Sequence, residues 1–294
     1  MTNRRFGVQE DLVRVVSSRK GHKAMLSREL TAEVAERLFN AERDASPIER
    51  LTVQYKDLDP ASAYAIQEGY IELRCRSGAK VVGRKIGCTS KPIQELFGID
   101  TPDFGVLLDD MQRANGAEIE LSQLIEPMVE PEVAFRLGAE LRGPGISSED
   151  VLAATAALIP ALEIIDSRIR GWNIAFADTV ADNGSSSLFV LGEERNMEIG
   201  VDLAAESVSF RRGGVEIDSD FATAVLGHPL NAVAWLVNSI AEFGGMLKAG
   251  EVVLSGSITK AARVRAGESY EARFSTLGAV SCSFTSESLR ENHA

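Results

Sequence analysis

The chain has 294 residues, of which 45% are hydrophobic, so it is long enough to bury one sizeable core and is not expected to be disordered. Its 31 lysines and arginines against 43 aspartates and glutamates give a net charge of -12, which repels phosphate backbones and argues against a nucleic-acid partner. Three widely spaced cysteines without a CxxC pair argue against a disulfide framework and a structural zinc site, and they indicate a reducing compartment.

The N-terminal stretch, residues 1–25, has no clear periodicity, and we interpret it as a flexible extension or as a segment that orders against a partner subunit. It contains basic residues but no continuous apolar region of a signal peptide. We also find no apolar run of the roughly 20 residues that a membrane span requires. A cytoplasmic protein without a membrane partner is therefore expected.

Two helices are predicted after this stretch. The first begins after Ser27, because apolar residues recur at helical spacing with charges between them. These apolar residues are Leu30, Val34, Leu38 and Ala41. The second begins after Asp59, which suits an N-cap and is followed by Pro60, and it ends at Gly78.

After Gly78 the chain changes character, because short segments rich in β-branched residues and punctuated by glycine or proline predict strands. These segments are residues 80–87, 127–137, 206–217 and 251–259. Helices are predicted between them over residues 147–160, with Ser147 and Asp150 spaced as a capping box, and over residues 228–245. The strands are too irregularly separated for a doubly wound series, so the predicted class is α+β.

The strongest candidate site lies in the predicted strand 129–137, where Glu130 and Glu132 alternate with apolar residues. A period of two places both glutamates on one face, about 7 Å apart at Cα, so their carboxylates can converge on one cation. A solvated strand face would have the same pattern. Two like charges so close raise each other's pKa unless a cation neutralises them.

The position of Glu163 favours a metal site over a solvated strand face, because this residue lies in an otherwise apolar segment where an unpaired charge is costly to bury. Three carboxylates without histidine or thiolate suit Mg²⁺ or Mn²⁺ and leave coordination positions for water and a chelating substrate. The alternative for Glu163 is a salt bridge to Arg168 or Arg170, and Asp166 is an alternative ligand.

Other polar residues are candidates with ordinary alternatives. Lys85 lies in a strand-like run, where a desolvated lysine can serve in acid/base chemistry or bind a carboxylate, but it also suits an outward-facing position. Asp103 is read as a turn residue, either an acid/base group or a turn former. Residues 180–187 and Thr259 offer polar donors that also suit plain loops.

Two other catalytic classes find little support in the sequence. No GxSxG segment occurs, and the internal histidine, His228, precedes a proline at a predicted helix start, which suits a cap better than a base. Neither a GxGxxG nor a Walker pattern is present, so no nucleotide cofactor is implied.

In order along the chain, VVGRKIGCTS, TPDFGVLLDDM, EPEVAF, IPALEIIDSRI, VADNGSS, VLGHPLNAVAWL and LSGSIT resemble the 2-keto-4-pentenoate hydratase and 4-oxalocrotonate decarboxylase family of the fumarylacetoacetate hydrolase superfamily. The resemblance runs from about Pro60 to about Phe284. It implies an N-terminal region, residues 1–78, whose helices pack on a catalytic domain, residues 79–294, built as a mixed β-roll around the metal. One departure is GSITK, where some members of the family have GALGP.

The resemblance also implies roles for particular residues. The family pattern of metal-binding glutamates falls on Glu130, Glu132 and Glu163. Lys85 and Asp103 match the acid/base pair. By the same matching, Ser185 and Thr259 are expected to contact the substrate carboxylate or to support the groups that do.

The activity that the resemblance implies is hydration of 2-hydroxypenta-2,4-dienoate or a close homologue to a 4-hydroxy-2-oxo acid, in the breakdown of aromatic or steroid rings. The alternatives are decarboxylation of a 4-oxalocrotonate-type 2-oxo acid and a non-catalytic partner subunit. A β-diketone hydrolase is disfavoured, because this chain has no suitable histidine. The family further implies a homo-oligomer built from dimers, up to a decamer, and association with a catabolic aldolase or decarboxylase.

Overall fold

The computed structural model describes residues 26–196 and 201–286, so the interpretation of residues 1–25 lies outside the described residues. The helices are α1 (Arg28–Arg43), α2 (Leu51–Gln54), α3 (Pro60–Arg76), α4 (Lys91–Phe97), α5 (Ser148–Ala154), α6 (Phe176–Ala181) and α7 (Pro229–Ala241). The strands are β1 (Val81–Gly87), β2 (Asp103–Leu108), β3 (Gln112–Arg113), β4 (Ala117–Glu120), β5 (Met128–Leu137), β6 (Thr155–Ile165), β7 (Ser186–Leu191), β8 (Arg195–Asn196), β9 (Ser207–Arg212), β10 (Val215–Phe221), β11 (Val252–Ser257), β12 (Ala262–Arg263), β13 (Ser269–Phe274) and β14 (Gly278–Thr285).

Within the described residues these strands form two mixed sheets. The larger sheet runs in the order β2-β1-β11-β5-β6-β7-β3, with β12 beside β5 and β8 beside β6. β5 pairs antiparallel with β6 and β11, whereas β1 pairs parallel with β11. The smaller sheet runs in the order β10-β9-β13-β14-β4. Mixed sheets with separate helices confirm the predicted α+β class.

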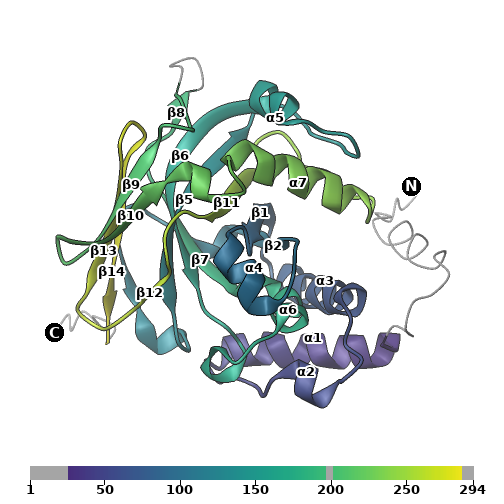
Figure 1. Cartoon of the computed structure of the whole chain (residues 1–294). Helices are drawn as coiled ribbons and strands as arrows, with labels where there is room; N and C mark the ends of the chain where they lie inside the picture. Colours follow the sequence, from purple (N-terminus) through teal and green to yellow (C-terminus); the bar gives the residue numbers. More distant parts are fainter. Residues whose placement is uncertain (1–25, 197–200, 287–294) are drawn as a thin grey trace, which may run out of the picture.

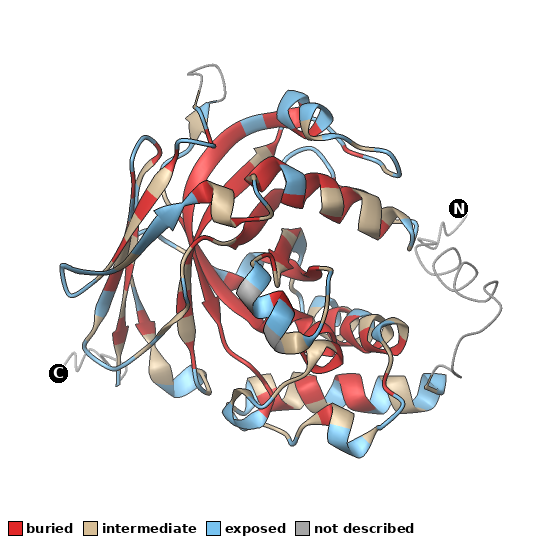
Figure 2. Ribbon diagram, viewed as in Figure 1, coloured by how far each residue is buried: buried red, intermediate tan, exposed pale blue. Residues whose placement is uncertain are grey.

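The larger sheet has a hydrophobic core on each face. One core joins β5 and β6 to α5, α7 and the smaller sheet, and the other joins the opposite face to α1, α3 and α6. Figure 1 shows the smaller sheet on one side of β5 and β6 and the N-terminal helices on the other, and Figure 2 shows that β5, β6 and β7 are buried along most of their length. Both faces of the central strands are therefore shielded from water.

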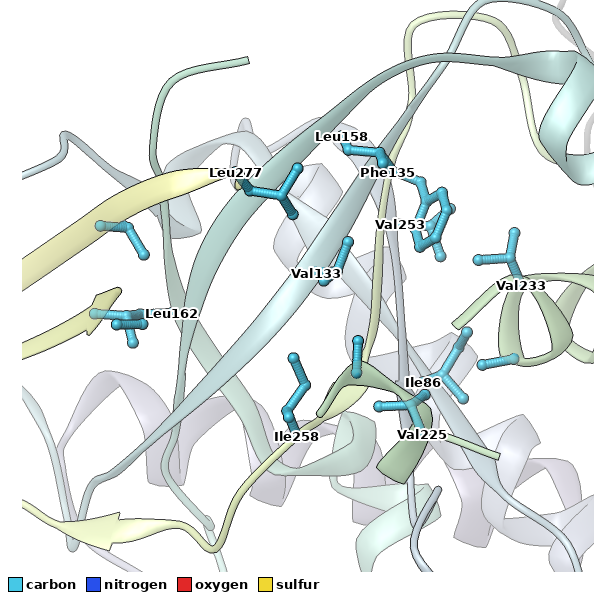
Figure 3. Packing of buried hydrophobic residues seen from close by; sticks show 14 of the residues in the cluster. Ile86, Val133, Phe135, Leu158, Leu162, Val225, Val233, Val253, Ile258 and Leu277 are labelled. Carbon is cyan, nitrogen blue, oxygen red and sulfur yellow. The ribbon is translucent and has the colours of Figure 1, made fainter. Parts of the chain in front are cut away.

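The close view of the first core (Figure 3) shows how residues of β5 and β6 pack together on one face of the larger sheet. Val133 and Phe135 of β5 lie beside Leu158 of β6 (Figure 3), and all three side chains are fully buried. Since neighbouring residues of a strand point to opposite faces, the residues between them face the second core.

The predicted N-terminal helices are confirmed with their caps. Ser27 caps α1 by accepting the amide of Leu30, and Asp59 caps α3 by accepting the amide of Ser62. The short helix α2 was not predicted. α1 and α3 contribute buried residues to the second core, so they pack against the sheet.

Two sequence interpretations need correction. The helix predicted over residues 147–160 ends at Ala154, after the predicted capping box, and the chain then enters β6. The apolar run looked helical because β6 is buried on both faces and lacks the alternation of a half-buried strand. Asp103 was read as a turn residue, but it is the first residue of β2 and pairs with Gly87 of β1.

The segment Ala222–Ala241 is long and apolar enough by length and composition to cross a membrane, which differs from our sequence interpretation. The segment contains α7, and Val233, Leu236 and Val237 of this helix are fully buried in the first core. A buried core helix accounts for this apolar stretch. His228 caps it by accepting the amide of Leu230, as the sequence suggested.

Candidate active site

Three glutamates meet on the face of the larger sheet that carries the second core. Glu130 of β5 pairs directly with Glu163 of β6, and Glu132 lies two residues further along β5 on the same face. One oxygen from each carboxylate lies within 4.8 Å of the other two. The strand spacing predicted from the sequence therefore does bring these side chains together.

The end of β11 and the residue after it hold Glu132 in place. The amide of Gly256 donates to Glu132 Oε2 at 2.7 Å, and the amide of Ile258 donates to the carbonyl of Pro131 at 3.0 Å. Gly256 has a φ of +113°, and a Cβ on it would lie 2.4 Å from Thr89 Oγ1. Glycine is required there, because another residue would meet both strain and a clash.

The carboxylates of these glutamates lack some of their hydrogen-bond donors among the described residues. Glu132 Oε1 and Glu163 Oε1 are buried and have no hydrogen-bond partner among the described residues. Burial and the charge of Glu163 raise the pKa of Glu130 to about 7, and burial with the charges of both neighbours raises the pKa of Glu132 well above its ordinary value. Buried oxygens without donors are what a bound cation would satisfy.

Lys85 of β1 brings a positively charged side chain to these three glutamates. Its Nζ lies 3.4 Å from Glu163 Oε2, and both side chains are buried. Burial disfavours its ammonium form, but the surrounding carboxylates, with Glu163 first, raise the pKa of Lys85 above its ordinary value. The alternative pairing of Glu163 with Arg168 or Arg170 is wrong, because those arginines pair with Asp182 and Glu49.

Asp103 lies beside Lys85. A Cβ on Gly87 would lie 2.2 Å from Asp103 Oδ1 and 3.4 Å from Lys85 Nζ, so both groups occupy the space above this glycine. Asp103 Oδ1 is buried and has no hydrogen-bond partner in the described part of the chain. Burial raises the pKa of Asp103, although Lys85 and hydrogen bonds from Thr179 and the Gly87 amide oppose the shift.

The turn after α6 is anchored by a buried ion pair. Arg168 Nε lies 2.6 Å from Asp182 Oδ1, and the hydroxyls of Ser167 and Ser185 donate to Asp182 Oδ2 at 2.9 and 3.0 Å. Burial raises the pKa of Asp182 to about 6, while Arg168 and the hydrogen bonds oppose the shift. This network fixes the polar segment 180–187 as a structured turn.

The remaining sequence candidates are placed as follows. Ser185 is buried, and its hydroxyl donates to Asp182 as described above. Thr259 is half-buried in the loop after β11, where its carbonyl accepts the hydroxyl of Ser257 at 2.7 Å. Asp166 does not join the glutamates, since its carboxylate accepts the amides of Ile125 and Glu126.

Two curated proteins resemble this chain over most of its length. The 2-hydroxyhexa-2,4-dienoate hydratase of Comamonas testosteroni is 41% identical over 263 residues, which cover 89% of this chain and 100% of the relative. The 2-keto-4-pentenoate hydratase of Paraburkholderia xenovorans (strain LB400) is 40% identical over 257 residues, which cover 87% of this chain and 96% of the relative. The chain belongs to the 2-keto-4-pentenoate hydratase family. No family model matches the chain.

Solved structures extend this hydratase family assignment to the fold. The 4-oxalocrotonate decarboxylase from Pseudomonas putida G7, complexed with magnesium and adipate, is 35% identical and has a TM-score of 0.87 over 89% of this chain and 100% of that chain. The fumarylpyruvate hydrolase from Pseudomonas aeruginosa is 16% identical with a TM-score of 0.55, over 69% of this chain and 89% of that chain, and shows a likeness of fold alone. The two hydratases and the decarboxylase confirm the resemblance to the 2-keto-4-pentenoate hydratase and 4-oxalocrotonate decarboxylase family of the fumarylacetoacetate hydrolase superfamily.

Sequence reasoning missed part of this hydratase-family site. Neither Thr179, which hydrogen bonds to Asp103, nor Asp182, which anchors the turn, was singled out. The buried hydroxyl of Ser186, which has no partner among the described residues, was seen only as part of a polar run. Asp182 could have been found from its position among apolar and small residues, because an acidic side chain that is buried there needs a charged or hydrogen-bonding partner.

Proposed function

We propose that the protein is a metal-dependent hydratase that adds water to 2-hydroxypenta-2,4-dienoate or a close homologue to give a 4-hydroxy-2-oxo acid. The observation that carries this proposal is the convergence of three carboxylates within 4.8 Å, with Lys85 beside them, in a chain about 40% identical to hydratases. A hydro-lyase acting on a small molecule is what this family membership supports.

The proposed ligands of a divalent cation are Glu130, Glu132 and Glu163. Glu132 Oε1 and Glu163 Oε1, which are buried and lack a partner among the residues that the structure describes, fit this role. An all-carboxylate set suits Mg²⁺ or Mn²⁺. The related decarboxylase is solved with magnesium, which supports a divalent ion here. A cation held there would supply a Lewis acid that stabilises negative charge on the 2-oxygen of the substrate.

Lys85 and Asp103 are the proposed proton carriers. Hydration requires that the 2-hydroxyl lose its proton and C5 gain one, which turns the dienol into a conjugated ketone. Water then adds as hydroxide at C4 and a proton at C3. Asp103 has a raised pKa and an oxygen that lacks a hydrogen-bond partner among the described residues, so it can hold a proton, and the Lys85 ammonium lies next to it. Both groups are fixed on adjacent strands, which favours catalysis by preorganised geometry.

Ser185 and Thr259 remain proposed to contact the substrate carboxylate or to support the groups that do. Thr259 is half-buried and follows the Ile258 amide that binds the backbone between Glu130 and Glu132. Ser185 directs its hydrogen to Asp182, so we propose the supporting role for it.

The test is the ultraviolet decay of freshly made 2-hydroxypenta-2,4-dienoate with Mg²⁺, with Mn²⁺ and with a chelator, while carbon dioxide release from 4-oxalocrotonate is followed in parallel. We expect decay that depends on the metal and no release of carbon dioxide. Release of carbon dioxide without hydration would assign the chain to the decarboxylase branch instead.

Decarboxylation of a 4-oxalocrotonate-type acid is the second candidate, supported by the 35% identity and TM-score of 0.87 to the solved decarboxylase. The hydratases are more similar in sequence, at 41% and 40% identity. The intact carboxylate group disfavours a non-catalytic partner subunit, and titration with Mn²⁺ tests it, because a scaffold has no need to bind metal.

We also propose a homo-oligomer built from dimers, up to a decamer, and association with a catabolic aldolase or decarboxylase. The exposed apolar side chains Val215, Ile217 and Phe221 of β10, at the edge of the smaller sheet, support an interface between subunits. Light scattering tests the oligomer. We further propose a cytoplasmic location and a role in aromatic ring catabolism. We also propose that the sheets form a β-roll, and that the N-terminal region and the catalytic domain divide at residue 78.

A further inference from the structure

The turn between α6 and β7 has an unusual backbone. Asn183, Gly184 and Ser185 have φ values of +59°, +60° and +54°, so three consecutive residues adopt the left-handed conformation. Residues other than glycine rarely adopt this conformation, so it persists only where the surroundings impose it. The contacts on both sides of this turn identify what imposes it.

The turn is fastened to β2 on one side and to the end of β6 on the other. The Asn183 side chain accepts the amide of Val106 at 2.7 Å and donates to its carbonyl at 3.0 Å. The turn lies so close to β2 that a Cβ on Gly105 would be 2.5 Å from the Asn183 carbonyl oxygen. At the other end, the Asp166 amide donates to the Ser185 carbonyl at 2.8 Å.

Between these attachments, Gly184 lies against the end of the Lys85 side chain. A Cβ on Gly184 would lie 2.6 Å from Lys85 Cε and 3.1 Å from Lys85 Nζ. The same ammonium meets Glu163 Oε2 at 3.4 Å. The lysine is therefore confined between the turn and the carboxylate.

We propose that Gly184 is a positioning residue for the reaction, because the left-handed turn forms a wall that holds the Lys85 ammonium beside Glu163 and Asp103. This inference rests on the proposed function in one respect, which is that Lys85 takes part in proton transfer. The wall requires glycine for two reasons, the positive φ and the absence of space for a methyl group.

The test compares Gly184→Ala with a control of matched backbone. Gly171 has φ 66° and ψ 21°, close to the φ 60° and ψ 26° of Gly184, but a Cβ on Gly171 would meet nothing within 4 Å. Both alanine variants carry the left-handed strain, and only Gly184→Ala displaces Lys85. We expect kcat of hydration to fall about a hundredfold in Gly184→Ala, as for a misplaced catalytic group. The KM of Gly184→Ala and the kcat of Gly171→Ala should change little.

A second measurement does not depend on activity. The loss of Tm caused by Gly184→Ala is measured in the wild-type background and in Lys85→Ala, which removes the atoms that the new methyl group meets. We expect a smaller loss in Lys85→Ala, approaching the loss caused by Gly171→Ala. The proposal would be overturned, whatever kcat does, if Gly184→Ala lowers Tm equally in the wild-type and Lys85→Ala backgrounds. It would also be overturned if Gly184→Ala prevents folding in both backgrounds. If the wild-type chain hydrates no dienoate, the proposed function fails, while this comparison still decides whether Gly184 confines Lys85.

Discussion

Glu130 and Glu163 lie directly opposite each other on the antiparallel strands β5 and β6. Directly paired residues on such strands have Cβ atoms about 4.5–5.5 Å apart, and like charges in this position destabilise a sheet. Glu163 is buried and Glu130 is half-buried, and Lys85 is the partner of Glu163. This arrangement of like charges costs stability unless a cation neutralises them, and the predictions that follow depend on it.

Replacement of Glu163 by glutamine keeps the shape of the side chain and removes one charge. We expect Mn²⁺ affinity to fall by more than about a hundredfold, since loss of even an indirect partner of a metal typically costs 10–100-fold. Hydration should fall with it. Isothermal titration and the ultraviolet assay measure both, and Glu118→Gln, an exposed change on β4, is the control. A variant that is active without metal would contradict the assignment.

Replacement of Lys85 by methionine should move activity and metal affinity in opposite directions. Loss of a proton carrier lowers kcat by about 10²–10⁴-fold. Loss of the ammonium beside Glu163 removes a charge that repels the cation, so Mn²⁺ should bind more tightly. Lys80→Met, an exposed change just before β1, should alter neither quantity. Weaker Mn²⁺ binding in Lys85→Met would show that the lysine supports the site in another way.

The stability of the metal-free protein should fall as the pH rises from about 4.5 to about 7. The pKa of Glu130 is about 7 in the folded chain against an ordinary value of 4.5, so the folded state binds more protons than the unfolded state in this range. Thermal unfolding with a chelator measures the effect, and Glu130→Gln should flatten it. Saturating Mg²⁺ should oppose the loss, because the ion binds the ionised carboxylates. A metal-free Tm that rises across this range would contradict the shift.

Asp182→Asn should destabilise the fold strongly, because it leaves the buried guanidinium of Arg168 without its charged partner. Breaking a buried pair in this way costs about 3–5 kcal/mol of unfolding free energy, which denaturant titration detects. The control is Asp44→Asn, which removes a solvent-exposed pair with Arg43 and should leave the free energy of unfolding unchanged. Equal effects of the two substitutions would show that the buried network is not structural.

Local patterns in the sequence predicted much of the fold and the site. Alternation along residues 129–137 placed Glu130 and Glu132 on one face, and cap residues such as Asp59 marked the helix starts. These features depend on neighbours within a few residues, so sequence alone carries them. The charge of Glu163 in an apolar segment also indicated a buried partner, although not which one.

The rest of the site depends on contacts between distant parts of the chain. Asp103 was misread because the pairing of β2 with β1, rather than its own neighbours, makes it a strand residue. The contact of Gly184 with Lys85 follows from the way the turn after α6 lies on β1 and β2. Spacing within one segment does not carry such information.

The side chain of Gln67 in α3 links the N-terminal helices to the strands and the turn that carry the proposed site. It is buried and donates to the carbonyl of Phe104, next to Asp103, at 3.0 Å and to that of Val180, before the left-handed turn, at 2.8 Å. Because α3 also shares a hydrophobic core with the sheet, the helices and the strands should unfold in one cooperative transition. We therefore expect that removing the residues before 78 would not leave a smaller chain that folds and works, because α3 supports the strands around Asp103 and the left-handed turn.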